Sequence, residues 1–115
     1  MTDVLSVPDE QEFLNEFGEA PQVQDEPWIR SISISSDNGT LELSFDSHER
    51  SIRFEWRDDD DVLWEFFRET ATSLVIRNEG GETYFVVSFE SAELSGNLDV
   101  RVYPKIAIKD VSLRD

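Results

Sequence analysis

Apolar and polar residues alternate from about residue 29 to residue 46, which predicts a β-hairpin. The segment SISISSDNGTLELSF places Asn38-Gly39, a preferred two-residue hairpin turn, between two alternating runs. This turn would place Ile34 opposite Leu43, with the apolar residues of both strands on one face. The pattern and the turn residues therefore agree on the same structure.

A third alternating run follows after a four-residue loop, 47–50, and completes a three-stranded meander. On the polar face, Arg53 and Arg57 are expected to neutralise Glu42 and Glu55 in a surface ion network. The apolar face is expected to pack against the rest of the protein through eight side chains: Ile32, Ile34, Leu41, Leu43, Phe45, Ile52, Phe54 and Trp56.

Two short segments have apolar residues at a helical spacing. In residues 9–17 one stripe holds Phe13, Leu14 and Phe17, with Gly18 suited to end a helix. In residues 60–69 the i,i+4 pairs are Val62 with Phe66 and Leu63 with Phe67, which predicts a second helix with Phe66 in the core.

The second half of the chain returns to alternation. A Gly80-Gly81 turn pairs Ile76 with Phe85, and two further strands follow, with a bulge or sheet edge expected near Asp110. The whole chain, 1–115, is therefore predicted to form a single α+β domain with residues 1–8 flexible. Its antiparallel β-sheet of about six to seven strands, beginning with the meander, would pack against the two short helices.

The charge balance restricts the partners of this domain. The chain carries 26 acidic and 10 basic residues, a net charge of −16, and its basic residues are scattered. Direct binding to nucleic acid or to an anionic membrane is disfavoured, because both require clustered Lys and Arg. No apolar run is long enough for a membrane span, cysteine is absent and no signal-peptide pattern opens the chain, so a cytoplasmic location is expected.

Candidate catalytic and metal-binding residues are few, and an enzyme is not expected. The lone His48 lies in a polar loop, where it is expected to be an exposed turn residue; a Ser-His-Asp site stays open, but its partners would all be near neighbours. The run Asp58–Asp61 has carboxylates for Mg²⁺ or Ca²⁺ but lacks the spacing of a calcium loop. No metal or cofactor is therefore expected.

The same aspartate run adjoins a large aromatic residue, Trp64. The four carboxylates can cap the predicted helix or form a surface that meets a basic partner. Trp64 projects from that helix as a second-layer core residue, a cap over the sheet edge or an aromatic anchor in an acidic rim. The candidate partner-binding residues are Asp58, Asp59, Asp60, Asp61, Trp64, Glu65 and Arg68, the last able to cover the Trp64 ring.

In size, acidity and α+β plan the chain resembles the small acidic immunity proteins that bacteria make against partner toxins, many of which act on nucleic acids and carry basic clefts. The resemblance implies a binding module that neutralises a basic toxin domain. A DNA mimic is a variant that the scattered arginines weaken. The main alternative is an acidic domain of a salt-adapted host, whose charge says nothing about partners. A small enzyme or ligand-binding domain would need a deep pocket.

Overall fold

The computed structural model describes residues 4–90 and 95–114, with side chains up to residue 108, and this part holds one helix and nine strands. The elements are α1 (Glu10–Phe17), β1 (Gln22–Val23), β2 (Ile29–Ser36), β3 (Gly39–Asp46), β4 (Ser51–Asp58), β5 (Asp61–Arg68), β6 (Ala71–Glu79), β7 (Glu82–Glu90), β8 (Ser95–Tyr103) and β9 (Ala107–Arg114). Within the described residues, no helix has the length and apolarity that a membrane crossing requires.

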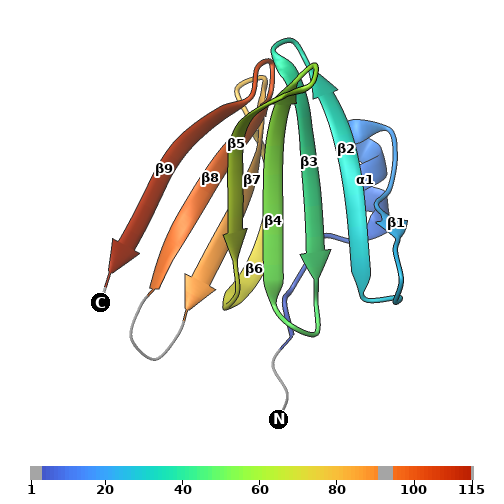
Figure 1. Ribbon diagram of the computed structural model, residues 1–115, viewed down its shortest axis with the longest axis vertical. Helices are drawn as coiled ribbons and strands as arrows, with labels where there is room; N and C mark the ends of the chain where they lie inside the picture. The colour runs from blue at the N-terminus through green and yellow to red at the C-terminus, as the bar shows by residue number, and fades with distance from the viewer. Residues whose placement is uncertain (1–3, 91–94, 115) are drawn as a thin grey trace.

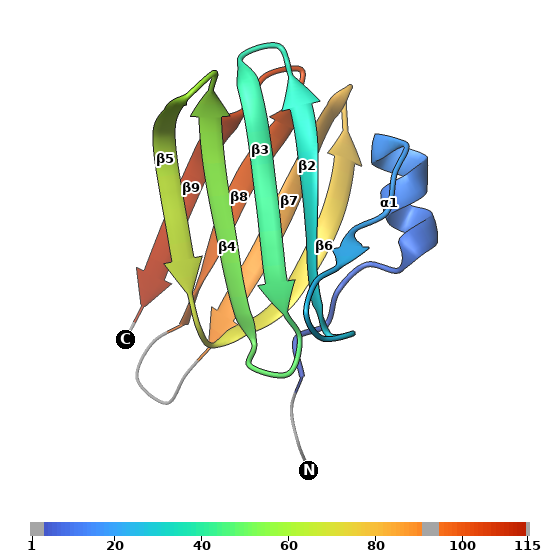
Figure 2. The ribbon, with the colours of Figure 1, turned by 45° about the vertical axis from the view of Figure 1, so that its right-hand side comes forward.

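The strands form two antiparallel sheets that pack face to face, with α1 at one side beside β2 and β6 (Figures 1 and 2). One sheet has the order β1-β2-β3-β4-β5 and the other β6-β7-β8-β9. The chain is thus mostly antiparallel sheet with one helix. The expectation of a single sheet of six to seven strands packed on two helices was wrong, because the second sheet, not a helix, covers most of the apolar face.

The segment 60–69 is not a helix but mainly β5, which pairs with β4 through Phe54↔Phe66 and Trp56↔Trp64. Apolar residues four apart share a face in a strand as well as in a helix, so the i,i+4 pairs do not distinguish the two. Aromatic and β-branched residues favour the strand, and pairing also satisfies the open edge of β4. The predicted second helix was therefore wrong.

The meander has the expected faces but a different first turn. The turn residues are Asp37 and Asn38, so Ile34 pairs with Leu41 instead of Leu43. Gly39 has φ 135° and its backbone lies against the carbonyl of Arg57, which leaves no room for a Cβ. A register shift of two preserves strand parity. The eight predicted apolar residues therefore share the inner face, where seven are buried and Trp56 packs against their cluster.

The Asn38 side chain ties this turn to the other sheet. Its amide donates to the Ile106 carbonyl at 2.9 Å, and its oxygen accepts the Ile106 N–H at 2.7 Å. The Trp56 indole donates to the Asn38 carbonyl at 3.1 Å. One asparagine therefore satisfies backbone groups between the sheets, which explains why the turn begins one residue earlier than expected.

Helix α1 is confirmed with its predicted ends. Asp9 caps the N-terminus through the Glu12 N–H at 2.9 Å, and Gly18 ends the helix in the left-handed conformation with φ 78°. The Phe13 ring lies between the sheets, 6.4 Å from Phe45 and 6.3 Å from Phe85. Leu14, expected on the same stripe, is exposed instead.

The second sheet follows the sequence prediction closely. Ile76 pairs with Phe85 across the Gly80-Gly81 turn, and β7 lies inside the sheet while β6 forms its edge. On β9 the register slips by one residue between 108 and 111, where the bulge was expected. At the N-terminus, Leu5 is buried and Ser6 bridges to Ser73, although both lie in the segment expected to be flexible.

Candidate partner-binding surface

The aspartate run forms the tight turn between β4 and β5. Asp58 pairs with Asp61, and Asp59 and Asp60 occupy the tip, where Asp59 adopts φ 55°. Aspartate is among the residues that tolerate this left-handed conformation best. All four side chains are exposed, and no helix follows them, so the helix-cap interpretation was wrong.

Trp64 lies on the inner face of β5, where it packs against the core. Its ring centroid is 6.2 Å from Phe54 and 5.7 Å from Phe66. Arg68 covers the Phe66 ring at 5.6 Å, not the Trp64 ring as expected. This position agrees with the core interpretation of Trp64 and separates it from Glu65, which faces outward opposite Glu55. The structure thus does not bring the seven predicted residues onto one face.

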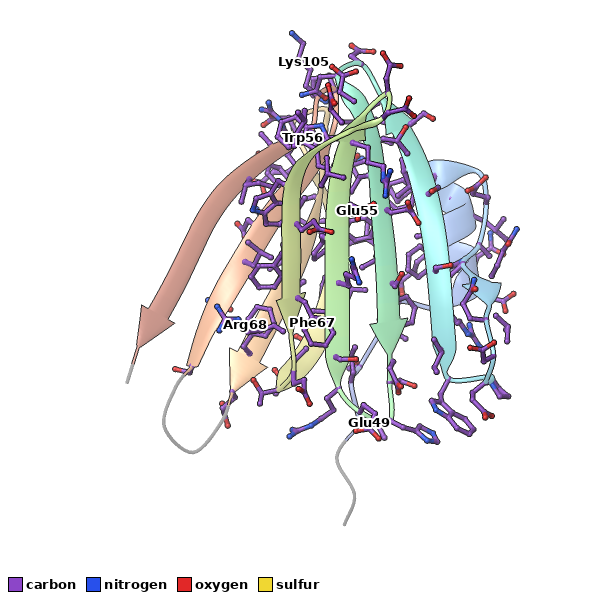
Figure 3. The ribbon with its side chains drawn as sticks, viewed as in Figure 1. Glu49, Glu55, Trp56, Phe67, Arg68 and Lys105 are labelled. Atoms are coloured by element: carbon purple, nitrogen blue, oxygen red, sulfur yellow. The ribbon has the colours of Figure 1, made fainter. Side chains whose placement is uncertain are left out.

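The outer face of the five-stranded sheet carries a row of three glutamates on adjacent strands. Glu42 on β3 pairs with Glu55 on β4, which in turn pairs with Glu65 on β5. Glu55 lies near the centre of this face in Figure 3 and is only 9% exposed. We call these three residues the glutamate row.

Two arginines on β4 flank the glutamate row, and the predicted ion network is confirmed for Glu55 but not for Glu42. Arg57 bonds to Glu55, whereas Arg53 lies 3.1 Å from Glu65 and 3.7 Å from Glu55. In the described part of the chain Glu42 makes no ion pair. The two guanidinium groups thus pair with two of the three carboxylates.

This network gives a prediction for acid stability. The hydrogen bond from Arg57 is the largest influence that holds the pKa of Glu55 below its ordinary value, followed by a hydrogen bond with Glu65. Because the folded-state pKa is lowered, the stabilisation is complete above the unfolded pKa of about 4.3 and is lost as the pH falls through the folded pKa. The free energy of unfolding should decline from about pH 4.3 downward, and Glu55→Gln should flatten that decline in denaturant titrations.

Glu79→Gln is the matched control for this acid-stability prediction, because the Glu79 side chain is 74% exposed and lies on the other sheet, where it pairs with Arg77. An unchanged slope in Glu55→Gln, with a flattened one in Glu79→Gln, would contradict the assignment.

Sequence reasoning missed an exposed apolar group on β5. Phe67 is 58% exposed, Leu63 51% and Val62 45%. Figure 3 shows Phe67 on the same strand as the inward Arg68, and its pairing with Arg53 places it on the outer face. The predicted helix put Leu63 and Phe67 in the core. In a strand, consecutive side chains point to opposite faces, so an inward Phe66 would have placed Phe67 on the solvent face.

The outer face is hollowed at two adjoining places that share Ser44 and Arg53. One hollow is lined by Glu42, Ser44, Arg53, Glu55 and Arg57. The other has a more apolar lining that includes Ile29 and Phe67. The surface therefore offers a contact with charges of both signs and an apolar contact side by side.

The remaining titratable candidates lie apart from this face. His48 is exposed in the β3–β4 loop and stacks on Trp28 with ring centroids 4.2 Å apart, as expected of a turn residue. In the part of the chain that the structure describes, no three His, Asp or Glu side chains converge as metal ligands would. The outer face is therefore the strongest candidate for a binding surface.

Comparison with known proteins adds one likeness of fold. A chain of a solved structure, a contact-dependent growth inhibition toxin–immunity protein complex from Klebsiella pneumoniae 342, superposes with a TM-score of 0.82 and 22% sequence identity. The alignment covers 97% of this chain and 99% of that chain. No protein-family model and no curated protein was found to match the sequence. At this identity the likeness establishes a shared fold.

Proposed function

We propose that the chain is an immunity protein that binds and neutralises a cognate bacterial toxin without catalysing a reaction, and that it does so in the cytoplasm. The observation that carries the proposal is the near-complete fold match to a chain of a toxin–immunity complex. The net charge of −16 supports a basic toxin domain as the partner, because opposite charge accelerates encounter and disfavours anionic competitors.

Within this proposal the predicted partner-binding residues divide into two groups. Asp58–Asp61 and Glu65 are exposed and can act directly on a basic partner. Trp64 and Arg68 pack over Phe66 and Phe54, and act by holding β5 in place. This division follows from the side of the sheet on which each residue lies.

The test is protection of growing cells. The chain should restore growth when it is co-produced with the toxin domain encoded beside it, and the purified pair should bind in calorimetry. The affinity should fall as salt rises, since exposed charges are screened beyond about 8 Å at physiological ionic strength. Neither protection nor binding by a folded chain would overturn the proposal.

The same samples test the salt-adapted alternative. An immunity protein should be folded in dilute buffer, as followed by circular dichroism. A chain that folds only in molar salt would favour host adaptation as the origin of its acidity.

A further inference from the structure

We infer that the outer face of β3, β4 and β5 is the surface that binds the toxin. Phe67 is its apolar contact, and the glutamate row is the binding site for a cationic side chain. This inference rests on the proposed function and specifies its partner as a basic protein surface that presents an arginine or a lysine beside an apolar patch.

Phe67 has no structural role that explains its exposure. Its side chain is 58% exposed, whereas its neighbour Phe66 packs against the core. No helix or strand within residues 4–90 and 95–114 covers the outer face (Figures 1 and 2). A large aromatic side chain in such a position is typical of a residue that becomes buried in a complex.

The carboxylates of the glutamate row outnumber the arginines that pair with them. Carboxylates directly opposite each other on neighbouring strands repel, and here Glu55 meets one on each side, Glu42 and Glu65. Arg53 and Arg57 pair with Glu55 and Glu65, which leaves Glu42 without an ion pair in the described part of the chain, and the aspartate turn adds further negative charge at the end of β4 and β5. A third cation would complete the network, and a partner can supply it.

Arginine suits this binding site best, because its planar guanidinium group can donate to two carboxylate oxygens at once and still lie against an aromatic ring. Of the two adjoining hollows, one is lined by Glu42 and Glu55 together with the two arginines, and the other lies beside Phe67. At the Glu42 side of the first hollow a guanidinium group of the partner would find a carboxylate that is unpaired within the described residues, and the second hollow would accept its apolar contact.

The outer face of the four-stranded sheet is a poorer candidate, although Val75 is 49% exposed there. Three of its acids are already paired. Asp99 and Glu79 lie 3.3 and 3.4 Å from Arg77, and Glu82 lies 2.7 Å from Arg101. This face therefore serves as the internal control.

The experiment compares Phe67→Ser with Val75→Ser in calorimetric titrations against the purified toxin domain. Phe67→Ser should weaken binding about thirtyfold, as truncation of a central interface aromatic typically does. Val75→Ser should bind as tightly as the unchanged chain. Thermal unfolding identifies any variant that has lost its fold, and Glu42→Lys, with Glu79→Lys as its control, tests the same face without touching an apolar residue.

The outcomes separate this inference from the proposed function. Tight binding by the unchanged chain, with Phe67→Ser and Glu42→Lys both within about threefold of it, would overturn the inference and leave the proposed function standing. Weaker binding by Val75→Ser alone would also overturn it. No binding by the unchanged chain would overturn the proposed function, and the inference with it.

Discussion

Phe85→Ala should lower the free energy of unfolding by about 3–5 kcal/mol, because it removes a fully buried ring and leaves a cavity between the two sheets. The Phe85 ring meets elements from every part of the fold. Its centroid lies 5.2 Å from Phe17, 6.0 Å from Phe54 and 6.3 Å from Phe13. Contacts with the helix and with the opposite sheet are lost together, so the cavity has little opportunity to collapse.

Phe67→Ala is the matched control, since it deletes the same atoms from an exposed position on β5. It should cost less than about 1 kcal/mol, in keeping with the modest effect of most surface substitutions. Urea titrations of the three proteins give both values, and unchanged m-values would justify the comparison. Similar losses in the two variants would mean that Phe67 belongs to the core and would also remove the basis for placing it at an interface.

The meander shows which features of the fold the sequence determines strongly. The alternating pattern correctly predicts that the eight apolar residues of the meander share one face, although the first turn begins one residue early. A shift of two residues in strand pairing leaves every side chain on its face of the sheet. The exact turn could not be predicted, because it depends on contacts far away in the chain. Asn38 is held by Ile106, and Gly39 by the backbone of Arg57.

The error in β5 has a different origin and affected the candidate site directly. In this segment the i,i+4 pairs fit a helix and a strand equally, and the structure is decided by pairing with β4 and by the opposite sheet. Trp64 was predicted to project from a helix and lies on the inner face of β5, whereas Phe67 was predicted in the core and lies on the surface. The choice of a helical period over a strand period therefore interchanged the predicted positions of Trp64 and Phe67. The predicted exposure of the aspartates did not depend on that choice.

The resemblance to immunity proteins rests on size, charge and the α+β plan, and of these only the plan depends on that assignment. The fold match is consistent with the resemblance. The contact surface is harder to predict from the sequence, because the glutamate row exists only when β3, β4 and β5 are in register. Residues 42, 55 and 65 have no recognisable spacing along the chain, so only the sheet pairing brings them together.

Replacing Asp58–Asp61 by four asparagines should slow association with the toxin about tenfold at low salt and make the rate less dependent on salt. The same variant should be slightly more stable on its own, by about 0.2–1 kcal/mol. Asp58 and Asp61 repel each other across the turn, and asparagine tolerates the left-handed conformation of Asp59. Stopped-flow mixing at several salt concentrations measures the rate, and thermal unfolding of the free chain gives the stability.

The matched control neutralises four exposed acids in and after α1: Glu10, Glu12, Asp25 and Glu26. Figure 2 shows α1 and β1 at the side of the sandwich away from β5. Both variants lose the same four negative charges, so a difference in association rate reports the position of the charge and not its total. Slower association in the turn variant, together with greater stability, would mean that the aspartates are kept for binding at the expense of folding. Equal rates in the two variants would assign the acidity to the long-range field of the whole chain, and the aspartate turn would then have no special part in recognition.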